Sequence, residues 1–150
     1  MRDEFSRLEI DETLPRISVP PERLMEQLRH HDLAPAISGE PLELFQDGHF
    51  NEAVRRACEK FEAKVQKLSS HLGKSGRDLM AKAFATSAYL DLQSVEDGNK
   101  QSFTEGFRLL TMGSMAAIRN IFSHGDEERR SPEECFEMLL LINWMFRLVK

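Results

Sequence analysis

The stretch NEAVRRACEKFEAKVQKLSSHL, residues 51–72, carries the clearest structural pattern in the chain. Its apolar residues recur at intervals of three and four, which is the spacing of an amphipathic helix that buries one face. They are Val54, Ala57, Cys58, Phe61, Val65, Leu68 and Leu72. We expect Asn51 to cap the start of this helix and Gly73 to end it.

The segments before this helix are shorter and more polar. Residues 1–19 mix charges with Pro15 and show no sustained period, which predicts an extended or partly ordered arm. Short segments follow: a helix over 22–31, a connection or helical turn over 32–40, and a helix over 41–47 closed by Gly48. We therefore divide the chain into an N-terminal arm with a short helix, residues 1–39, and a helical domain, residues 40–150.

The segments after residue 73 also follow helical spacing. We expect helices over 79–90 and over 100 to about 122, with a polar loop at 94–99 between them. Ser131, Pro132 and Glu134 form a capping box with proline at the first helical position, which starts a last helix ending near residue 149. No segment alternates apolar and polar residues as a strand does, so the fold class is all-α.

The last helix is apolar almost all round, from Cys135 to Val149. A helix that is apolar on every side has to be covered on every side. One small domain offers too little surface for that, so we expect this helix to form a face of a homodimer.

Composition and net charge limit the classes of protein to which this chain can belong. The 150 residues carry a formal charge of −5, with 41% hydrophobic residues, and fit one soluble domain. Proteins that coat nucleic acid are usually basic, so any RNA contact should be local. Cys58 and Cys135 lie in apolar helical patterns and indicate reduced core residues of a cytoplasmic protein. The most apolar run, 138–149, is too short to span a bilayer, so we expect no membrane contact.

Two motifs have a simpler explanation than the sites they suggest. Gly73-Lys74-Ser75 lacks the glycine five residues earlier that a phosphate-binding loop needs. His30 and His31 are adjacent and point apart on a helix, and no ligand pair has metal-binding spacing, so we expect neither metal nor cofactor.

A basic face lines the helix of residues 51–72, at Arg56, Lys60, Lys64, Lys67 and His71. We interpret it as a solvated surface with pairs such as Glu52–Arg56 and Arg55–Glu59. The alternative is a strip that steers RNA toward the protein.

The candidate site is Ala117-Ile118-Arg119-Asn120-Ile121-Phe122-Ser123-His124-Gly125. Arg119 supplies a permanent cation with a planar fork of donors suited to phosphate, and His124 can exchange a proton near neutral pH. Five steps along an unbroken helix would place the two side chains about 140° apart. The helix must therefore end between them, or the pair must act across an interface. A plainer alternative is that Arg119 caps carbonyls and His124 only packs.

Three separated blocks resemble the Ymh-type branch of the HEPN superfamily across residues 40–149. The blocks are Leu44-Phe45-x-x-Gly48-His49-Phe50-x-x-Ala53-Val54, Leu79-Met80-x-x-Ala83-Phe84, and Glu105-Gly106-Phe107…Gly113…Ile118-Arg119-Asn120-x-x-x-His124. Ile121 departs from the branch, in which a proline commonly follows the Arg-Asn pair.

The resemblance implies an antiparallel α-helical bundle that dimerises so that two motifs share a cleft. It also implies a metal-independent endoribonuclease of the kind found in toxin–antitoxin and anti-phage systems, with an antitoxin or regulatory protein as a further partner. Arg119, Asn120 and His124 match the catalytic motif residue by residue. Other domains of this superfamily are non-catalytic and bind partner proteins or nucleotides, which remains the alternative.

With these residues, His124 would act as general base on a ribose 2′-hydroxyl or as general acid on the leaving 5′-oxygen. Arg119 would stabilise charge on the phosphoryl oxygens, and Asn120 would orient the phosphate or hold the loop.

Overall fold

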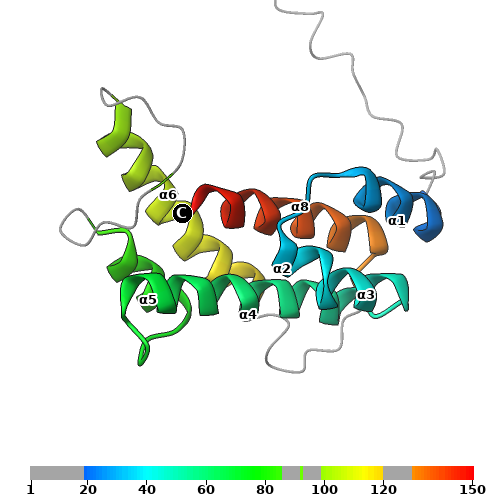
Figure 1. Cartoon of the computed structure of the whole chain (residues 1–150), viewed down its shortest axis with the longest axis horizontal. Coiled ribbons are helices and arrows are strands. Elements are labelled where there is room, and N and C mark those ends of the chain that lie inside the picture. Colours follow the sequence, from blue (N-terminus) through cyan, green and yellow to red (C-terminus); the bar gives the residue numbers. More distant parts are fainter. Residues whose placement is uncertain (1–18, 86–91, 93–98, 120–129) are drawn as a thin grey trace, which may run out of the picture.

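Helices make up the regular structure of this protein. The computed structural model describes residues 19–85, 92, 99–119 and 130–150. In chain order the elements are α1 (Pro21–His30), α2 (Pro35–Ser38), α3 (Glu40–Gln46), α4 (Phe50–Ser69), α5 (Gly76–Ala83), α6 (Lys100–Ser114), the π-helix η3 (Met115–Arg119) and α8 (Pro132–Leu148) (Figure 1). Within these ranges the only β contact is an isolated antiparallel bridge between Leu92 and Val149. The all-α prediction is confirmed.

The start of α8 follows from its local sequence. Ser131 adopts an extended backbone and its side-chain oxygen accepts a hydrogen bond from the backbone N–H of Glu134, at 3.2 Å. Pro132 occupies the first helical position, where its missing N–H costs nothing. The predicted cap is confirmed.

The predicted ends of α4 are wrong by one and three residues. The helix begins at Phe50, and the side-chain oxygen of Asn51 accepts a bond from the backbone N–H of Arg130 at 3.2 Å instead of capping its own helix. The helix ends at Ser69 because Ser70 turns into the left-handed region, with φ of 60°. Leu72 consequently lies beyond the helix and is 75% exposed, so it does not belong to the buried stripe.

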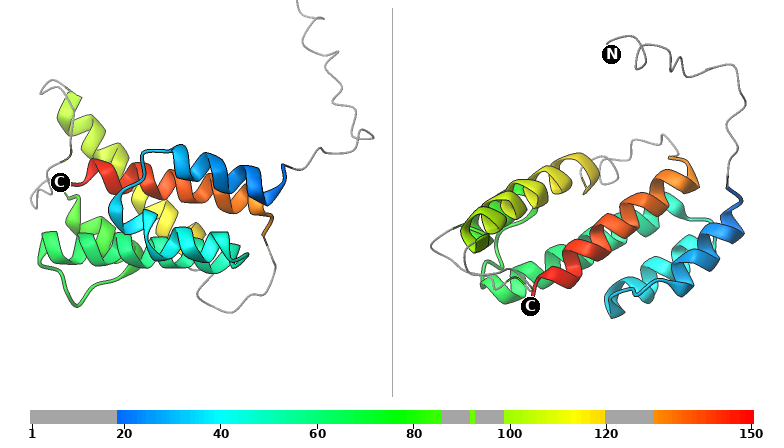
Figure 2. Two further views of the ribbon diagram at one scale, coloured as in Figure 1. Left: turned by 45° about the vertical axis from the view of Figure 1, so that its right-hand side comes forward. Right: turned by 90° about the horizontal axis from the view of Figure 1, so that it is seen from above.

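The central pair of the fold is α4 and α8, which run in the same direction. Asn51 contacts Arg130 at one end of the pair, and at the other end the Lys64 ammonium donates to the carbonyls of Phe146, at 3.0 Å, and Val149. Figure 2 shows α1 on one side of α8, and α6 on the other side running in the opposite direction. Between α4 and α8 the chain returns through α5 and α6, which brings the start of α8 back to the start of α4.

The core is a single cluster to which α1 also contributes. Its largest fully buried side chains include Phe45 of α3, Phe61 of α4, Met80 of α5, Met115 of η3 and Ile142 of α8. Leu24, Met25 and Leu28 of α1 join the same cluster. The short helix assigned to the N-terminal arm thus packs against the helical domain; the boundary at residue 40 stays a prediction.

Among the described residues, no helix is both long enough and apolar enough to cross a bilayer.

Candidate active site

Glu62, on the buried face of α4, is the side chain that contacts Arg119 of the candidate site. It lies one helical turn after Cys58 and one before Val65, both fully buried, so its carboxylate is carried into the interior. Only 6% of the side chain is exposed. A carboxylate in such a place needs charged or hydrogen-bonding partners to remain ionised.

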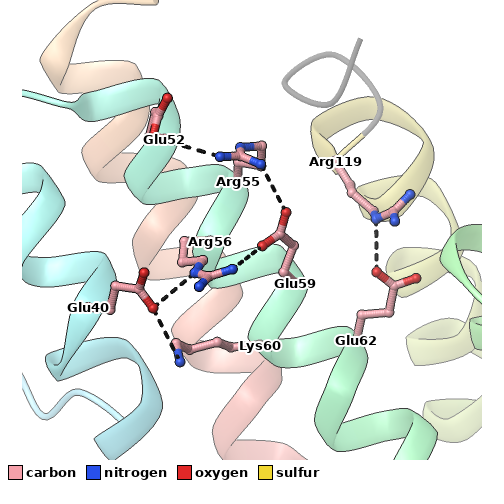
Figure 3. A network of polar contacts seen from close by, with 8 residues as sticks. All are labelled: Glu40, Glu52, Arg55, Arg56, Glu59, Lys60, Glu62 and Arg119. Atoms are coloured by element: carbon pink, nitrogen blue, oxygen red, sulfur yellow. Dashed lines mark hydrogen bonds and ion pairs between the residues drawn. The ribbon is translucent and has the colours of Figure 1, made fainter. Parts of the chain in front are cut away.

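Glu62 has a different partner on each oxygen. Oε2 lies 2.8 Å from Nε of Arg119 (Figure 3). Oε1 accepts a hydrogen bond from the backbone N–H of Gly76. Gly76 is the first residue of α5, where backbone N–H groups face outward and a negative charge is favoured. Glu62 therefore serves as a cap for α5 and as the counter-ion of Arg119 at the same time.

Arg119 lies at the end of a helix that changes its winding. The regular α-helix stops at Ser114, and the five residues Met115–Arg119 form a π-helix. Met115 and Ile118 of this segment are buried, whereas the Arg119 side chain is 28% exposed. Wide turns of this kind are rare and occur often at functional sites.

The electrostatic arrangement keeps a cation at the surface and its counter-ion inside. The buried Nε atom of Arg119 forms an ion pair with Glu62 whose geometry is not that of a hydrogen bond. The two terminal nitrogens of an arginine form a fork that suits a phosphate group. An anchored arginine at a partly exposed position can contact a phosphodiester without first being ordered.

The structure describes one of the three predicted site residues. Arg119 occupies the position just given, whereas Asn120 and His124 lie outside the described residues. The plainer prediction, that Arg119 caps carbonyls, does not describe its contact with Glu62. Arg108, on α6, makes a contact of that kind: its Nε donates to the carbonyl of Ala81, in the last turn of α5, at 2.7 Å.

Glu62 is not among the site residues predicted from the sequence. The signal was present, because Glu62 interrupts the apolar stripe of residues 51–72 at a position that helical spacing assigns to the core. A charge at such a position indicates a buried partner or a functional role.

Two of the side chains on the basic face of α4 form ion pairs with acidic side chains. Arg56 contacts Glu40 at 2.9 Å and Glu59 at 2.8 Å, and Lys60 contacts Glu40 at 3.6 Å (Figure 3). These pairs lower the pKa of Glu40, chiefly through the hydrogen bond from Arg56. The interpretation as a solvated, paired surface is supported over that of an RNA strip.

One predicted pair on this face is confirmed and the other is wrong. Arg55 contacts Glu59 at 3.2 Å, as predicted. Glu52 lies 3.7 Å from Arg55, whereas Arg56 is turned toward Glu40 and Glu59. The side chain of Lys64 leaves the surface to reach the end of α8, and burial lowers its pKa.

Metal binding and thiol chemistry would depend on the histidine, cysteine, aspartate and glutamate side chains of the described ranges. No three histidine, cysteine, aspartate or glutamate side chains gather there as a metal site would require. Cys58 and Cys135 are both buried and unpaired, as predicted for core thiols. Burial raises the pKa of each thiol to about 12.

Comparison with known families identifies one relationship. A profile of the family described as "Protein of unknown function (Hypoth_ymh)" matches residues 31–149. Comparison with curated proteins and with solved structures found no match.

Proposed function

The chain belongs to the Hypoth_Ymh family, and we propose that it is a metal-independent endoribonuclease of the HEPN type. The observation that carries the proposal is Arg119: it occupies the arginine position of the resembled motif, and its guanidinium group is anchored by buried Glu62 while remaining partly exposed.

In the proposed reaction His124 removes the proton of a ribose 2′-hydroxyl, and the 2′-oxygen forms a bond to phosphorus. The bond between phosphorus and the 5′-oxygen breaks, and the leaving oxygen takes a proton from a second acid, supplied by the His124 of another subunit. Arg119 stabilises the negative charge that builds on the non-bridging oxygens, and Asn120 orients the phosphate. The products are a 2′,3′-cyclic phosphate and a 5′-hydroxyl, and DNA is not a substrate.

A homodimer would supply the second histidine, and α6 offers a surface for it. The outward face of α6 carries two exposed apolar side chains, Leu109 at 61% and Leu110 at 39%. Gly106 and Gly113 lie on the same face and have open space where a side chain would be. Small residues let a second helix approach closely, and an exposed apolar face favours association. By contrast, α1 and α4 already cover much of α8, the face expected from the sequence.

We place the protein in the cytoplasm, as a toxin or anti-phage effector controlled by an antitoxin or regulatory protein. The same α6 face favours a second candidate function, a non-catalytic module that binds another protein through this helix.

Cleavage of RNA in excess EDTA tests the proposal. We expect wild-type protein to cut RNA but not DNA of the same sequence, and to leave cyclic phosphate ends. Arg119→Ala and His124→Ala should each lose cleavage, whereas Arg77→Ala, at an exposed position on α5, should retain it. Equal cleavage by all four preparations would identify a contaminating nuclease and refute the proposal, and absence of cleavage by wild-type protein would favour the binding module.

A further inference from the structure

The bond from the Gly76 N–H gives Glu62 a structural role at the start of α5, but that role does not require its second oxygen to be buried beside an arginine. Moving a carboxylate out of water is costly, and the attraction of one cation often does no more than offset that cost. Replacing a buried ion pair by apolar side chains is frequently neutral or stabilising. A leucine or methionine at position 62 would continue the apolar stripe of α4 without burying a charge, and would lose the bond to Gly76.

The pair is also unlike the other ion pairs in the described ranges. In those pairs the acidic side chains lie on the outside, with Glu40, Glu52, Glu59 and Glu134 between 31% and 60% exposed and Asp32 92% exposed. Glu62 is 6% exposed, and its arginine is the more exposed partner. Figure 3 shows the contrast between the Glu59 network on the surface of α4 and the separate Glu62–Arg119 contact.

Both oxygens of Glu62 are committed, which holds the carboxylate in one orientation. The bond from Gly76 ties it to the start of α5, and Gly76 has a φ of 55°, a conformation that a residue with a side chain rarely adopts. The remaining oxygen forms the ion pair with Arg119. The carboxylate therefore joins three elements: α4, α5 and η3.

We propose that Glu62 is the positioning residue of the ribonuclease site, holding the guanidinium group of Arg119 by their ion pair at the place where it meets the phosphodiester of RNA. The role rests on the proposed function, because it is exerted on the reaction through Arg119. Glu62 itself does not touch the substrate.

The test compares Glu62→Gln with Glu59→Gln. Glutamine at position 62 keeps the size and one oxygen for Gly76, but presents an amide N–H where Arg119 needs an acceptor. Glu59 lies three residues earlier on the same helix and pairs only with Arg55 and Arg56 in the contacts described above, so its variant removes the same charge without contacting Arg119. We expect kcat/KM on RNA to fall on the order of 100-fold in Glu62→Gln, as misplacement of a catalytic group does, and to change less than threefold in Glu59→Gln.

A second measurement separates positioning from folding. In Arg119→Ala protein, free guanidinium at millimolar concentration should bind beside Glu62 and restore part of the cleavage. The same addition should restore nothing in the Glu62→Gln/Arg119→Ala double variant. A purely structural Glu62 would give equal rescue in both backgrounds, or none in either, and both results would overturn the proposal.

The outcomes distinguish this role from the function on which it rests. Absence of cleavage by wild-type protein overturns the ribonuclease itself. Cleavage by wild-type protein that is undiminished or increased in Glu62→Gln overturns the positioning role alone. Should Glu62→Gln fail to fold, Glu62→Leu provides the apolar replacement: a folded but inactive Glu62→Leu protein supports the role, and an active one refutes it.

Discussion

Asn143 is a fully buried amide within the mostly apolar helix α8. Its side-chain oxygen accepts a hydrogen bond from the backbone N–H of Ala34 at 2.7 Å, and its amide nitrogen donates to the carbonyl of Asp32 at 3.2 Å. These bonds satisfy the backbone of the segment that joins α1 to α2 and hold that segment against α8. A single side chain thus fixes a connection more than 100 residues away in sequence.

Replacing Asn143 by leucine should lower the free energy of unfolding. The substitution leaves the buried Ala34 N–H without a partner, which costs about 1–3 kcal/mol. Urea-induced unfolding, followed by circular dichroism, measures the change. The control is Glu137→Leu at an exposed position of the same helix, for which we expect less than about 0.5 kcal/mol. Equal losses in the two variants would contradict the role given to Asn143.

Burial changes the ionisation of the two cysteine thiols, Cys58 and Cys135. Because burial raises the pKa of both thiols to about 12, the native protein should not react with a thiol reagent at pH 8, whereas both thiols should react after denaturation. A free thiol in the unfolded chain titrates near pH 8.5. The stability that the buried thiols contribute is therefore complete below about pH 8.5 and is lost as the pH rises toward 12.

The measurement of this pH dependence is unfolding by urea between pH 8 and pH 10. Wild-type protein should lose stability with rising pH more steeply than the Cys58→Ala/Cys135→Ala variant, which lacks both titrating groups. Parallel profiles, or rapid labelling of the native protein, would show that the thiols are accessible.

At the scale of elements, α5 and α8 begin in two different ways. Ser75 and Ser131 occupy the same position relative to their helices, and both have extended backbones. Ser131 caps α8 with its own side chain, whereas Ser75 makes no such bond and the carboxylate of Glu62 caps α5 from another helix. The start of α5 therefore depends on tertiary structure.

This difference predicts unequal effects of the same substitution. Ser131→Ala should destabilise the protein by about 1 kcal/mol, as loss of a serine cap does. Ser75→Ala should change the free energy of unfolding by only a few tenths of that amount, because no bond is lost. Thermal or urea unfolding of the two variants side by side provides the test, and similar losses would mean that Ser75 also caps its helix.

At the scale of the whole molecule, the exposed apolar face of α6 predicts association. Leu109→Arg should prevent the proposed dimer from forming, because a buried cation facing its own copy is strongly unfavourable. Leu72→Arg is the matched control, since Leu72 is 75% exposed beyond the end of α4. Sedimentation equilibrium at micromolar concentration should then give a dimer mass for the control and for wild-type protein.

Activity links this prediction to the proposed site. If the acid and the base come from different subunits, Leu109→Arg should lose RNA cleavage together with the dimer. A monomeric wild-type protein would refute the dimer, and a monomeric Leu109→Arg protein with full activity would refute a site shared between subunits.

Local sequence was enough to determine the all-α class, the capping box of α8 and the buried thiols. Each depends on residues within one or two helical turns, and interactions at that range follow directly from the spacing of side chains. Sequence also singled out Arg119, because its chemistry and the family motif can be recognised without coordinates. The roles of Asn120 and His124 rest on the sequence alone, since both residues lie outside the described part of the chain.

Tertiary structure decided how these parts are combined. It turned Asn51 from an expected cap of α4 into an acceptor for the start of α8, ended α4 at Ser69, and placed α4 and α8 in parallel. Above all, it paired Arg119 with Glu62 and Glu62 with Gly76, residues from three different elements. The physical reason is that a buried charge needs a partner, and the partner is chosen by distance in space, which spacing along the chain does not determine.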